Sequence, residues 1–517
     1  MTVDPRTPIL IGVGQITDTE TPFESARSPM DLAEEAARLA VLDARLPETK
    51  LADLNSIAIL RWFSDTSHRF SCPFGRARNP PVALARRLGA SPREAIYTYA
   101  GGNMPQWLVN RNAELIAEGE RDFALICGSE ALRTWPAAQR AGYELDYTEG
   151  PDDPEPHQLG INRVGWSEHE DLHGMNAAIA LYPLFENGIR AHRGRSIEQH
   201  SLEMGKLFER FAAVAKDNLY ATRRQGYSAE DISTTSQSNR MIWFPYPKLM
   251  NANAYVDQGA AVLMSSVEKA RELGVPEDRW IYLHGCADTC DHWALSEREN
   301  YHSCPAIRVG ARKALDMAGR TLNDMSFFDL YSCFPSAVEI GCEEIGLAED
   351  DPRGLTVTGG LPYFGGPGNN YVTHSIATIA GKLRANPGKF GLVTANGNYV
   401  TKHSFGVYST VPTEGPWIRE NPSVYQSELD ARPKPAFTET PAGAATIETY
   451  TVLNRRSGPE KGIVIGRLSA TGERFISNVG DGDVGALNEL QSNEGVGRAG
   501  SVRPDGGRNV WSHASSD

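Results

Sequence analysis

Six histidines and cysteines between residues 284 and 304 could bind a metal ion. The set is His284, Cys286, Cys290, His292, His302 and Cys304. Structural zinc sites usually pair their ligands at short spacings such as Cys-x2-Cys, whereas the spacings here are irregular. The stretch "IYLHG" has the pattern of a strand whose end carries a loop. We therefore predict reduced structural or loop residues, with a metal site as the less favoured alternative.

The stretch "HEDLH" (169–173) matches the His-Glu-x-x-His pattern of zinc hydrolases. That chemistry needs a helix that continues past both histidines, so that the two imidazoles share one face. Gly174 follows the second histidine directly, and the preceding "RVGWSE" has no helical pattern. We predict a polar surface loop here and no metal in the protein.

Two glycine-rich stretches could bind phosphate through backbone N–H groups. "GGLPYFGGPGNNY" (359–371) has the composition of an anion-binding loop, but it lacks the Lys-Ser or Lys-Thr of a P-loop. "GVG" (12–14) follows a predicted strand, but Thr17 stands where a dinucleotide fingerprint has its third glycine. Neither stretch therefore predicts a nucleotide site.

Predicted strands and helices alternate in two series, which indicates an α/β protein with two similar halves. In the first series Ser28 is the expected N-cap of a helix. The first series has strands in "TPILIGVGQ", 123–132 and 256–266, and helices at 28–44, 105–120 and 196–224. The second series has strands at 280–285, 324–334 and 389–398, and helices at 304–319, 335–347 and 372–386.

Changes of composition divide the chain into an expected N-terminal half (1–270), a C-terminal half (271–410) and a further region (411–517). The first half contains an inserted loop domain at about 131–250. The further region begins with a linker, 411–435, which is rich in proline and charge. It continues with β-rich runs that predict a small barrel or sandwich and ends in residues expected to be frayed, "GGRNVWSHASSD".

The composition is that of a globular protein of more than one domain. The chain has 517 residues, 40% of them hydrophobic, and a formal net charge of −14, which argues against a broad nucleic-acid or anionic-membrane surface. It shows no apolar run long enough to cross a membrane and no signal-peptide pattern. An odd number of cysteines, seven, indicates reduced thiols. We predict a cytoplasmic protein.

The order of these landmarks resembles the thiolase superfamily near the sterol-carrier-protein type of thiolase. The segments that carry the resemblance are "ILIGVGQ…SPMDLAEEAARLAVLDA", "VDQGAAVLMSS" and "LHGCADTCDHWALSERENYHSCPAIRVGARKAL", within residues 7–410. The additional C-terminal region resembles that of the type 1 thiolase-like group. The resemblance implies the thiolase fold, with two similar α/β halves in αβαβα layers and an inserted loop domain, followed by a small β-rich domain.

Thiolases act through four loops, and three of the four lack their reactive group here. In "YTYAGGNMPQW" the nucleophilic cysteine is replaced by Ala100, and a methyl group cannot form an acyl-enzyme. In the loop that carries Gly-His-Pro in thiolases, the histidine that donates to the oxyanion is replaced by Gly366. The Cys-x-Gly loop begins with Ala395, so a second thiol is also absent.

The remaining loop retains one reactive group. It reads Tyr331-Ser332-Cys333-Phe334 and keeps the cysteine of the sterol-carrier type, which makes Cys333 the best candidate for acid/base chemistry, while Tyr331 replaces a polar group that orients a water. His403 is the second catalytic candidate, with Lys402 beside it, and His374 is a further histidine that could face the site. Each of these groups is also a common structural residue.

The loss of three groups together favours a thiolase-like protein that binds coenzyme A or acyl-CoA without ordinary thiolase activity. Backbone groups at Gly365, Gly366 and Gly397 are the expected ligand contacts, and no covalent cofactor is expected. One alternative is an active acyltransferase or carbon–carbon bond enzyme of lipid metabolism that uses Cys333 without an acyl-enzyme. The other is an interaction module whose C-terminal domain binds a protein partner. Nucleic acid and membrane insertion are not expected.

Overall fold

The computed structural model describes residues 3–66 and 68–513, and its central feature is a repeated arrangement of four strands. In the first half the strand order is β1-β8-β4-β2, and in the second half it is β9-β12-β11-β10. In both, the first two pairings are antiparallel and the third is parallel. The first set is β1 (Pro8–Thr17), β8 (Asp257–Ser266), β4 (Phe123–Ala131) and β2 (Ser56–Ile59). The second is β9 (Ile281–Cys290), β12 (Lys402–Ser409), β11 (Phe390–Gly397) and β10 (Met325–Asp329). The prediction of two similar halves is confirmed.

The two sets join into one ten-stranded sheet through a short contact. Ile9 pairs with Tyr282 and Leu10 with Ile281, where β1 meets β9. At the other end of the first half, β3 (Glu94–Thr98) follows β2, and the three-residue strand β5 (His157–Leu159) pairs along the outer edge of β3. β5 therefore covers an edge that would otherwise expose unpaired backbone groups.

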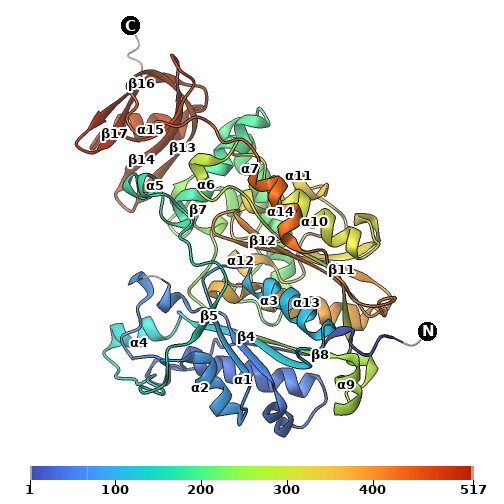
Figure 1. Cartoon of the computed structure of the whole chain (residues 1–517). Coiled ribbons are helices and arrows are strands. Elements are labelled where there is room, and N and C mark those ends of the chain that lie inside the picture. Colours follow the sequence, from blue (N-terminus) through green and yellow to red (C-terminus); the bar gives the residue numbers. More distant parts are fainter. Residues whose placement is uncertain (1–2, 67, 514–517) are drawn as a thin grey trace.

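Helices separate and cover the two halves of the sheet, which gives five layers (Figure 1). α3 (Met104–Ala117) and α13 (Tyr371–Ala385) lie between the halves and pack on strands of both. α1 (Pro29–Asp43) and α2 (Pro80–Leu88) cover the outer face of the first half, while α10 (Pro305–Met317) covers that of the second and packs in turn on α11 (Pro335–Ile345). The N-termini of α3 and α13 are therefore both inside the protein.

The "GVG" stretch of β1 packs against α1. Ser28 caps α1 as predicted, in a capping box with Asp31. A Cβ at Gly12 would overlap the carbonyl oxygen of Ala40, and one at Gly14 would overlap that of Ala36. These glycines therefore let a helix lie close to a strand, and this accounts for them without a nucleotide.

The inserted segment of the first half contains the long helix α7 (Ile197–Asp217), which is shorter than predicted. Asn218 turns to an extended conformation, and its side-chain amide donates to the carbonyl oxygen of Thr358. The backbone N–H groups of Thr222 and Arg223 then donate to the carbonyl oxygens of Phe364 and Tyr363. The polar sequence after Asp217 therefore docks against the second half instead of extending the helix. The other elements of this segment are α4 (Trp135–Ala141), α5 (Glu168–Leu172), α6 (Ala178–His192), α8 (Ala229–Ser233), β6 (Met241–Phe244) and β7 (Tyr246–Pro247), and α9 (Val267–Leu273) follows β8.

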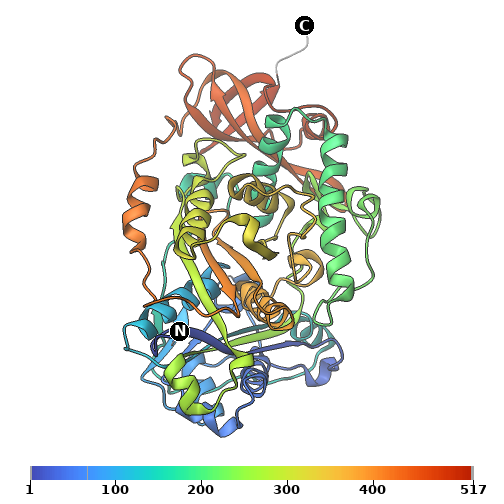
Figure 2. The same ribbon diagram turned by 90° about the vertical axis from the view of Figure 1, so that its right-hand side faces the viewer.

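The C-terminal region is a closed five-stranded barrel that lies at the end of the molecule opposite α1 and α2 (Figures 1 and 2). The strands pair around in the order β14-β15-β17-β16-β13, and β13 closes on β14. They are β13 (Gly443–Arg455), β14 (Gly458–Leu468), β15 (Arg474–Val479), β16 (Ala499–Asp505) and β17 (Arg508–His513), with α15 (Val484–Ser492) packed on β13 and β14. Because this sheet closes on itself, the C-terminal region is a barrel and not a sandwich, the two forms that its sequence predicted. The expectation of a frayed tail is wrong for residues 508–513, while 514–517 lie outside the described residues.

The barrel is fixed to the rest of the protein by buried polar contacts and by strand pairing. β13 pairs with β6, where Val452 lies opposite Phe244. The fully buried Arg474 donates to the carbonyl oxygen of Ser296 outside the barrel at 2.9 Å and is balanced within the barrel by an ion pair with Glu448 on β13. The barrel is thus packed on the two α/β halves and is not a loosely tethered unit.

Residues 411–435, predicted as a linker, contain the helix α14 (Pro422–Asp430). Tyr425 and Leu429 are buried against the second half, and Arg419 forms ion pairs with Asp288 and Glu114. Residues 411–435 therefore form an ordered segment, although their proline-rich composition predicted a linker, because they contact residues far away in the sequence. In the described parts of the chain, none of the helices has the length and apolar character needed to cross a membrane.

A candidate ligand site at four converging loops

The structure brings the four loops together at the inner ends of α3 and α13. The N–H of Gly101 donates to Oδ1 of Asn369 at 2.8 Å, which connects the loop before α3 to the loop before α13. Lys402, at the start of β12, donates to the carbonyl oxygen of Ala100 at 2.7 Å. A Cβ at Gly102 would overlap the hydroxyl of Tyr331, so glycine is required where these loops touch.

The glycine-rich stretch 359–371 is buried throughout, and it contains the short helix α12 (Gly360–Tyr363). Gly365 and Gly368 have φ angles of +129° and +56°, which favour glycine. The N–H of Gly366 donates to the carbonyl oxygen of Asn253 at 2.9 Å, and a Cβ there would meet only one atom as close as 3.4 Å, on Leu361. The buried loop packs between domains, which excludes the solvent-facing anion cradle that its composition suggested.

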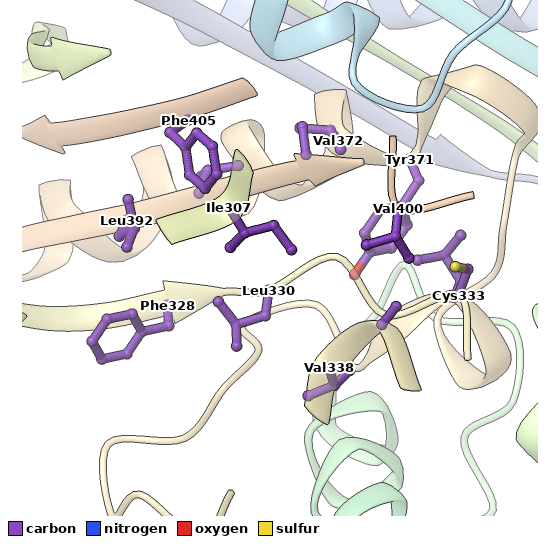
Figure 3. Packing of buried hydrophobic residues seen from close by; sticks show 14 of the residues in the cluster. Ile307, Phe328, Leu330, Cys333, Val338, Tyr371, Val372, Leu392, Val400 and Phe405 are labelled. Atoms are coloured by element: carbon purple, nitrogen blue, oxygen red, sulfur yellow. The ribbon is translucent and has the colours of Figure 1, made fainter. Parts of the chain in front are cut away.

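Cys333 lies in the hydrophobic core with only 7% of its surface exposed, and Figure 3 shows it within this cluster. Burial raises the pKa of its thiol to about 12, although the Tyr182 hydroxyl that hydrogen bonds to it partly opposes the shift. The ring of Tyr182 stacks on Phe334 at a centroid distance of 4.5 Å, and Asn396 donates to its hydroxyl at 3.0 Å. Cys333 is therefore a protonated thiol in an aromatic environment at neutral pH.

His403 faces a different set of groups from Cys333. Its Nε2 lies 3.5 Å from the sulfur of Cys304, and that sulfur lies 3.3 Å from Oδ2 of Asp291. Burial lowers the pKa of His403 to about 4, so its imidazole is neutral at physiological pH. The two catalytic candidates thus have separate hydrogen-bond partners, and their roles stay predictions.

Lys402 is a buried cation inside the converging loops. Only 2% of its surface is exposed, and among the described residues none provides a carboxylate within ion-pair distance of its ammonium group. Burial lowers its pKa to about 8. Holding a lysine here without a counter-ion costs stability, which is typical of groups retained for function.

A surface cavity of 400 Å³ reaches Ala100. Its lining includes Asn398 and Tyr399, which with Val400 form three successive non-glycine residues in the left-handed region, at φ angles of +52°, +62° and +59°. Such a turn is strained in L-residues and is held by its contacts. Asn398 donates to the carbonyl oxygen of Arg163 at 3.2 Å, and the ring of Tyr399 stacks on Trp166 at 6.0 Å. Among the described residues that line this cavity, none is a cysteine or a histidine.

His374, on α13, does not face this cavity. Its Nδ1 lies 2.9 Å from Oε1 of Gln15, and the edge of its ring contacts Phe364. Burial lowers its pKa to about 3. The structure therefore places it as a neutral core residue between α13 and β1.

Comparison with known proteins identifies the fold. The crystal structure of a monomeric SCP2-thiolase like protein type 1 from Mycobacterium smegmatis is 39% identical in sequence, with a TM-score of 0.84. The match covers 99% of this chain and 100% of that one. This chain belongs to the type 1 SCP2-thiolase-like proteins. The resemblance inferred from its sequence is thereby confirmed.

Three further comparisons match the C-terminal domain, the fold and part of the sequence. Residues 425–507 match the family described as the thiolase-like protein type 1 additional C-terminal domain. An acetyl-CoA acetyltransferase structure from Syntrophomonas wolfei, 14% identical, shares the fold at a TM-score of 0.55 over 79% of this chain and all of that one. A curated acetyl-CoA acetyltransferase of Methanocaldococcus jannaschii is 30% identical over 110 residues, 21% of this chain and 28% of that enzyme, so the match spans less than a third of its length.

In this type 1 thiolase-like protein the histidine and cysteine cluster divides between a strand and a loop. His284, Cys286 and Cys290 lie on β9, whereas His292, His302 and Cys304 lie in the segment between β9 and α10, where the ring of His302 stacks on His192 at 3.7 Å. All seven cysteines are free. Among the residues that the structure describes, the only group of His, Cys, Asp or Glu side chains close enough to share a cation is Glu186, His200 and Glu339. In that group His200 and Glu186 are 2.5 Å apart, and Arg193 lies 2.9 Å from Glu339, so a positive charge is already present.

The "HEDLH" stretch differs from the predicted surface loop. Glu168–Leu172 form the short helix α5, and both Glu170 and His173 are fully buried. Glu170 accepts from the N–H of Ser296 at 2.7 Å, and His173 accepts from the N–H of Asn509 on β17 at 3.1 Å. The motif therefore joins the barrel to the thiolase halves. A single sequence gives no signal for this role, because the partners are more than one hundred residues away.

Sequence reasoning did not single out Tyr182, Arg61 or Arg163. Tyr182 reaches the site from α6, and Arg61 and Arg163 line the cavity at Ala100. Tyr182 reaches the second half, where it contacts Asn396 and Phe334, whereas Arg61 follows β2 in the first half. A single sequence does not report such contacts.

Proposed function

We propose that this protein binds coenzyme A or acyl-CoA without forming an acyl-enzyme, and that the acyl end of the ligand lies in the cavity at Ala100. The observation that carries the proposal is the cavity itself, which reaches the position of the thiolase nucleophile at a residue without a thiol. The substitutions at Ala100, Gly366 and Ala395 support it, because thiolytic chemistry needs the groups that they lack.

The remaining thiol near the loops argues against the alternative of a Cys333-based enzyme. A thiol with a pKa of about 12 is almost entirely protonated at neutral pH, and Cys333 is buried beside the Tyr182 hydroxyl. His403, the other candidate, donates to or accepts from groups around Cys304 instead. The Lys402 ammonium, which donates to the carbonyl oxygen of Ala100, places a positive charge beside the cavity without supplying a thiol nucleophile, and this favours binding of a thioester over its cleavage.

Calorimetric titration of the full-length protein with CoA and acetyl-CoA tests this function. We expect saturable binding of both ligands, weakened about tenfold by Ala100→Leu, because a larger side chain fills the cavity. Ala470→Leu, in an exposed turn of the barrel, is the matched control and should bind as the wild type does. Absence of saturable binding at millimolar ligand would overturn the proposal.

We extend the proposal to a cytoplasmic location, which is supported by the seven free cysteines. Fractionation of the cells that make the protein tests this part. Recovery of the protein in an oxidising compartment or in a membrane fraction would contradict it.

A further inference from the structure

The cavity at Ala100 contains two arginine side chains that lack carboxylate partners. Arg61 and Arg163 both line it, and neither forms an ion pair with any of the residues described by the structure. By contrast, Arg76 pairs with Asp65 and Arg86 pairs with Asp153. The cavity lining therefore holds two guanidinium groups that no described carboxylate pairs with.

Arg61 is held in one orientation from several sides. Its Nε donates to the carbonyl oxygen of Asp65 at 3.2 Å, and its Nη1 donates to Oε1 of Gln158 at 3.1 Å. The guanidinium carbon lies 5.1 Å from the ring centroid of Tyr97. Nη2 makes no hydrogen bond to a described residue and is not among the buried unpaired atoms. Arg61 thus presents an oriented, solvent-accessible donor to the cavity.

Arg163 approaches the cavity from the segment that the strained turn holds in place. Its carbonyl oxygen accepts from Asn398, and its guanidinium carbon lies 4.9 Å from the ring centroid of Trp293. That guanidinium makes no hydrogen bond to a described residue, so all of its donors are available to a ligand. The Asn398 side chain, in the left-handed turn, thus fixes the backbone of Arg163 at the cavity.

The one acidic side chain in the lining does not neutralise these arginines. Asp65 forms an ion pair with Arg76 and accepts from the hydroxyl of Tyr97 at 2.6 Å. Behind the carbonyl of Ala100 lies the ammonium group of Lys402, which adds a third positive charge near the same point. The cavity thus carries a positive charge within a protein whose net charge is −14.

We propose that the cavity at Ala100 binds an organic carboxylate, which Arg61 and Arg163 hold between them. The planar fork of a guanidinium matches the two oxygens of a carboxylate, and the lining residues Tyr99, Trp166 and Tyr399 suit the carbon chain that carries it. A volume of 400 Å³ accommodates a small acid or the acyl end of a thioester. This inference rests on the proposed function in one respect, because it names the acyl group as one that ends in a carboxylate.

Titration calorimetry with the full-length protein separates the possible sources of the carboxylate. The ligands are succinate, its uncharged diamide, inorganic phosphate, succinyl-CoA and butyryl-CoA. We expect succinate to bind at least about tenfold more tightly than the diamide or phosphate, and succinyl-CoA about tenfold more tightly than butyryl-CoA. Equal binding of succinate and the diamide, or tighter binding of phosphate, would overturn the carboxylate assignment.

Three variants test the residues. Arg163→Gln lies on an exposed segment and should weaken succinate binding about tenfold without changing the fold. Arg61→Lys keeps the charge but loses the fork and should weaken it similarly. Arg312→Gln, at an exposed position on α10, is the matched control and should have no effect. Unchanged succinate binding in both cavity variants would overturn the proposal.

The failures of the two proposals are distinguishable. If CoA thioesters bind but a terminal carboxylate adds no affinity, the proposed function stands and the carboxylate inference fails. If succinate binds in an arginine-dependent way but no CoA thioester binds, the cavity is a carboxylate site and the proposed function fails.

Discussion

Replacement of Lys402 by methionine should make the protein more stable at neutral pH. The lysine amine has a pKa of about 8 in the folded protein against 10.5 in the unfolded chain. At pH 7 this difference corresponds to a cost of about 3 kcal/mol in the free energy of unfolding. Methionine removes that cost but also the hydrogen bond to Ala100, worth about 1–2 kcal/mol. We expect a net gain of about 1–2 kcal/mol.

The pH dependence gives the sharper form of this prediction. Because the folded pKa is the lower one, the unfolded state binds more protons between pH 8 and 10.5, and the stability of the wild type rises with pH across that window. The advantage of Lys402→Met should therefore shrink by about 2–3 kcal/mol between pH 7 and pH 10. Urea unfolding followed by tryptophan fluorescence at several pH values measures it, with the exposed Lys389→Met as control.

A variant that is less stable than the wild type at pH 7, with a difference that does not change up to pH 10, would refute the reasoning. It would mean that Lys402 has a counter-charge or ready access to water. The predicted result would instead show that the protein keeps a buried amine at the converging loops at the expense of stability.

Three other predictions concern the thiol, the histidines and the glycines. Iodoacetamide at pH 8 should leave Cys333 unmodified in the folded protein and alkylate it in urea, because burial raises the pKa of its thiol to about 12. Peptide mass spectrometry measures the alkylation, and equal labelling in both states would contradict the prediction. Each buried neutral histidine should lower the free energy of unfolding by about 1–2 kcal/mol between pH 7 and pH 5. Because its folded pKa lies below the unfolded value of 6.5, only the unfolded state takes up a proton as the pH falls. A melting temperature that does not change over this range would contradict this prediction. These histidines are His173, His284, His374 and His403. Gly14→Ala should destabilise the fold by about 3 kcal/mol or more, because the new Cβ would overlap the carbonyl oxygen of Ala36. Gly381→Ala, on the open face of α13, should instead stabilise the fold by about 0.5–1 kcal/mol. Thermal denaturation of the two variants measures the difference, and similar effects would argue against the close packing of α1 on β1.

Local signals accounted for much of the fold. The capping box at Ser28 and the apolar face behind it placed α1 within one residue, because a helix start depends on nearby side chains. The alternation of strands and helices predicted two similar halves, which the repeated strand order confirms. The closure of the barrel, the position of α14 and the burial of "HEDLH" were not predictable in this way. They depend on partners far along the chain, such as Asn509 for His173.

The candidate site was predictable in part, for a related reason. Ala100, Gly366 and Ala395 could be compared with the reactive residues of thiolases, and this comparison depends on sequence order alone. The cations around Ala100 were not predictable, because Arg61 and Arg163 reach the cavity from separate segments. His403 was a catalytic candidate because it follows the fourth loop, but in the structure its ring lies beside the sulfur of Cys304.

The most direct test of the central claim is the intact mass of the protein after incubation with acetyl-CoA, on samples for which calorimetry has measured binding. A protein that binds the thioester at a site without a nucleophile should show saturable binding and an unchanged mass. An added acetyl group on any cysteine would contradict this account, since it would show that the protein forms the acyl-enzyme that Ala100 cannot provide.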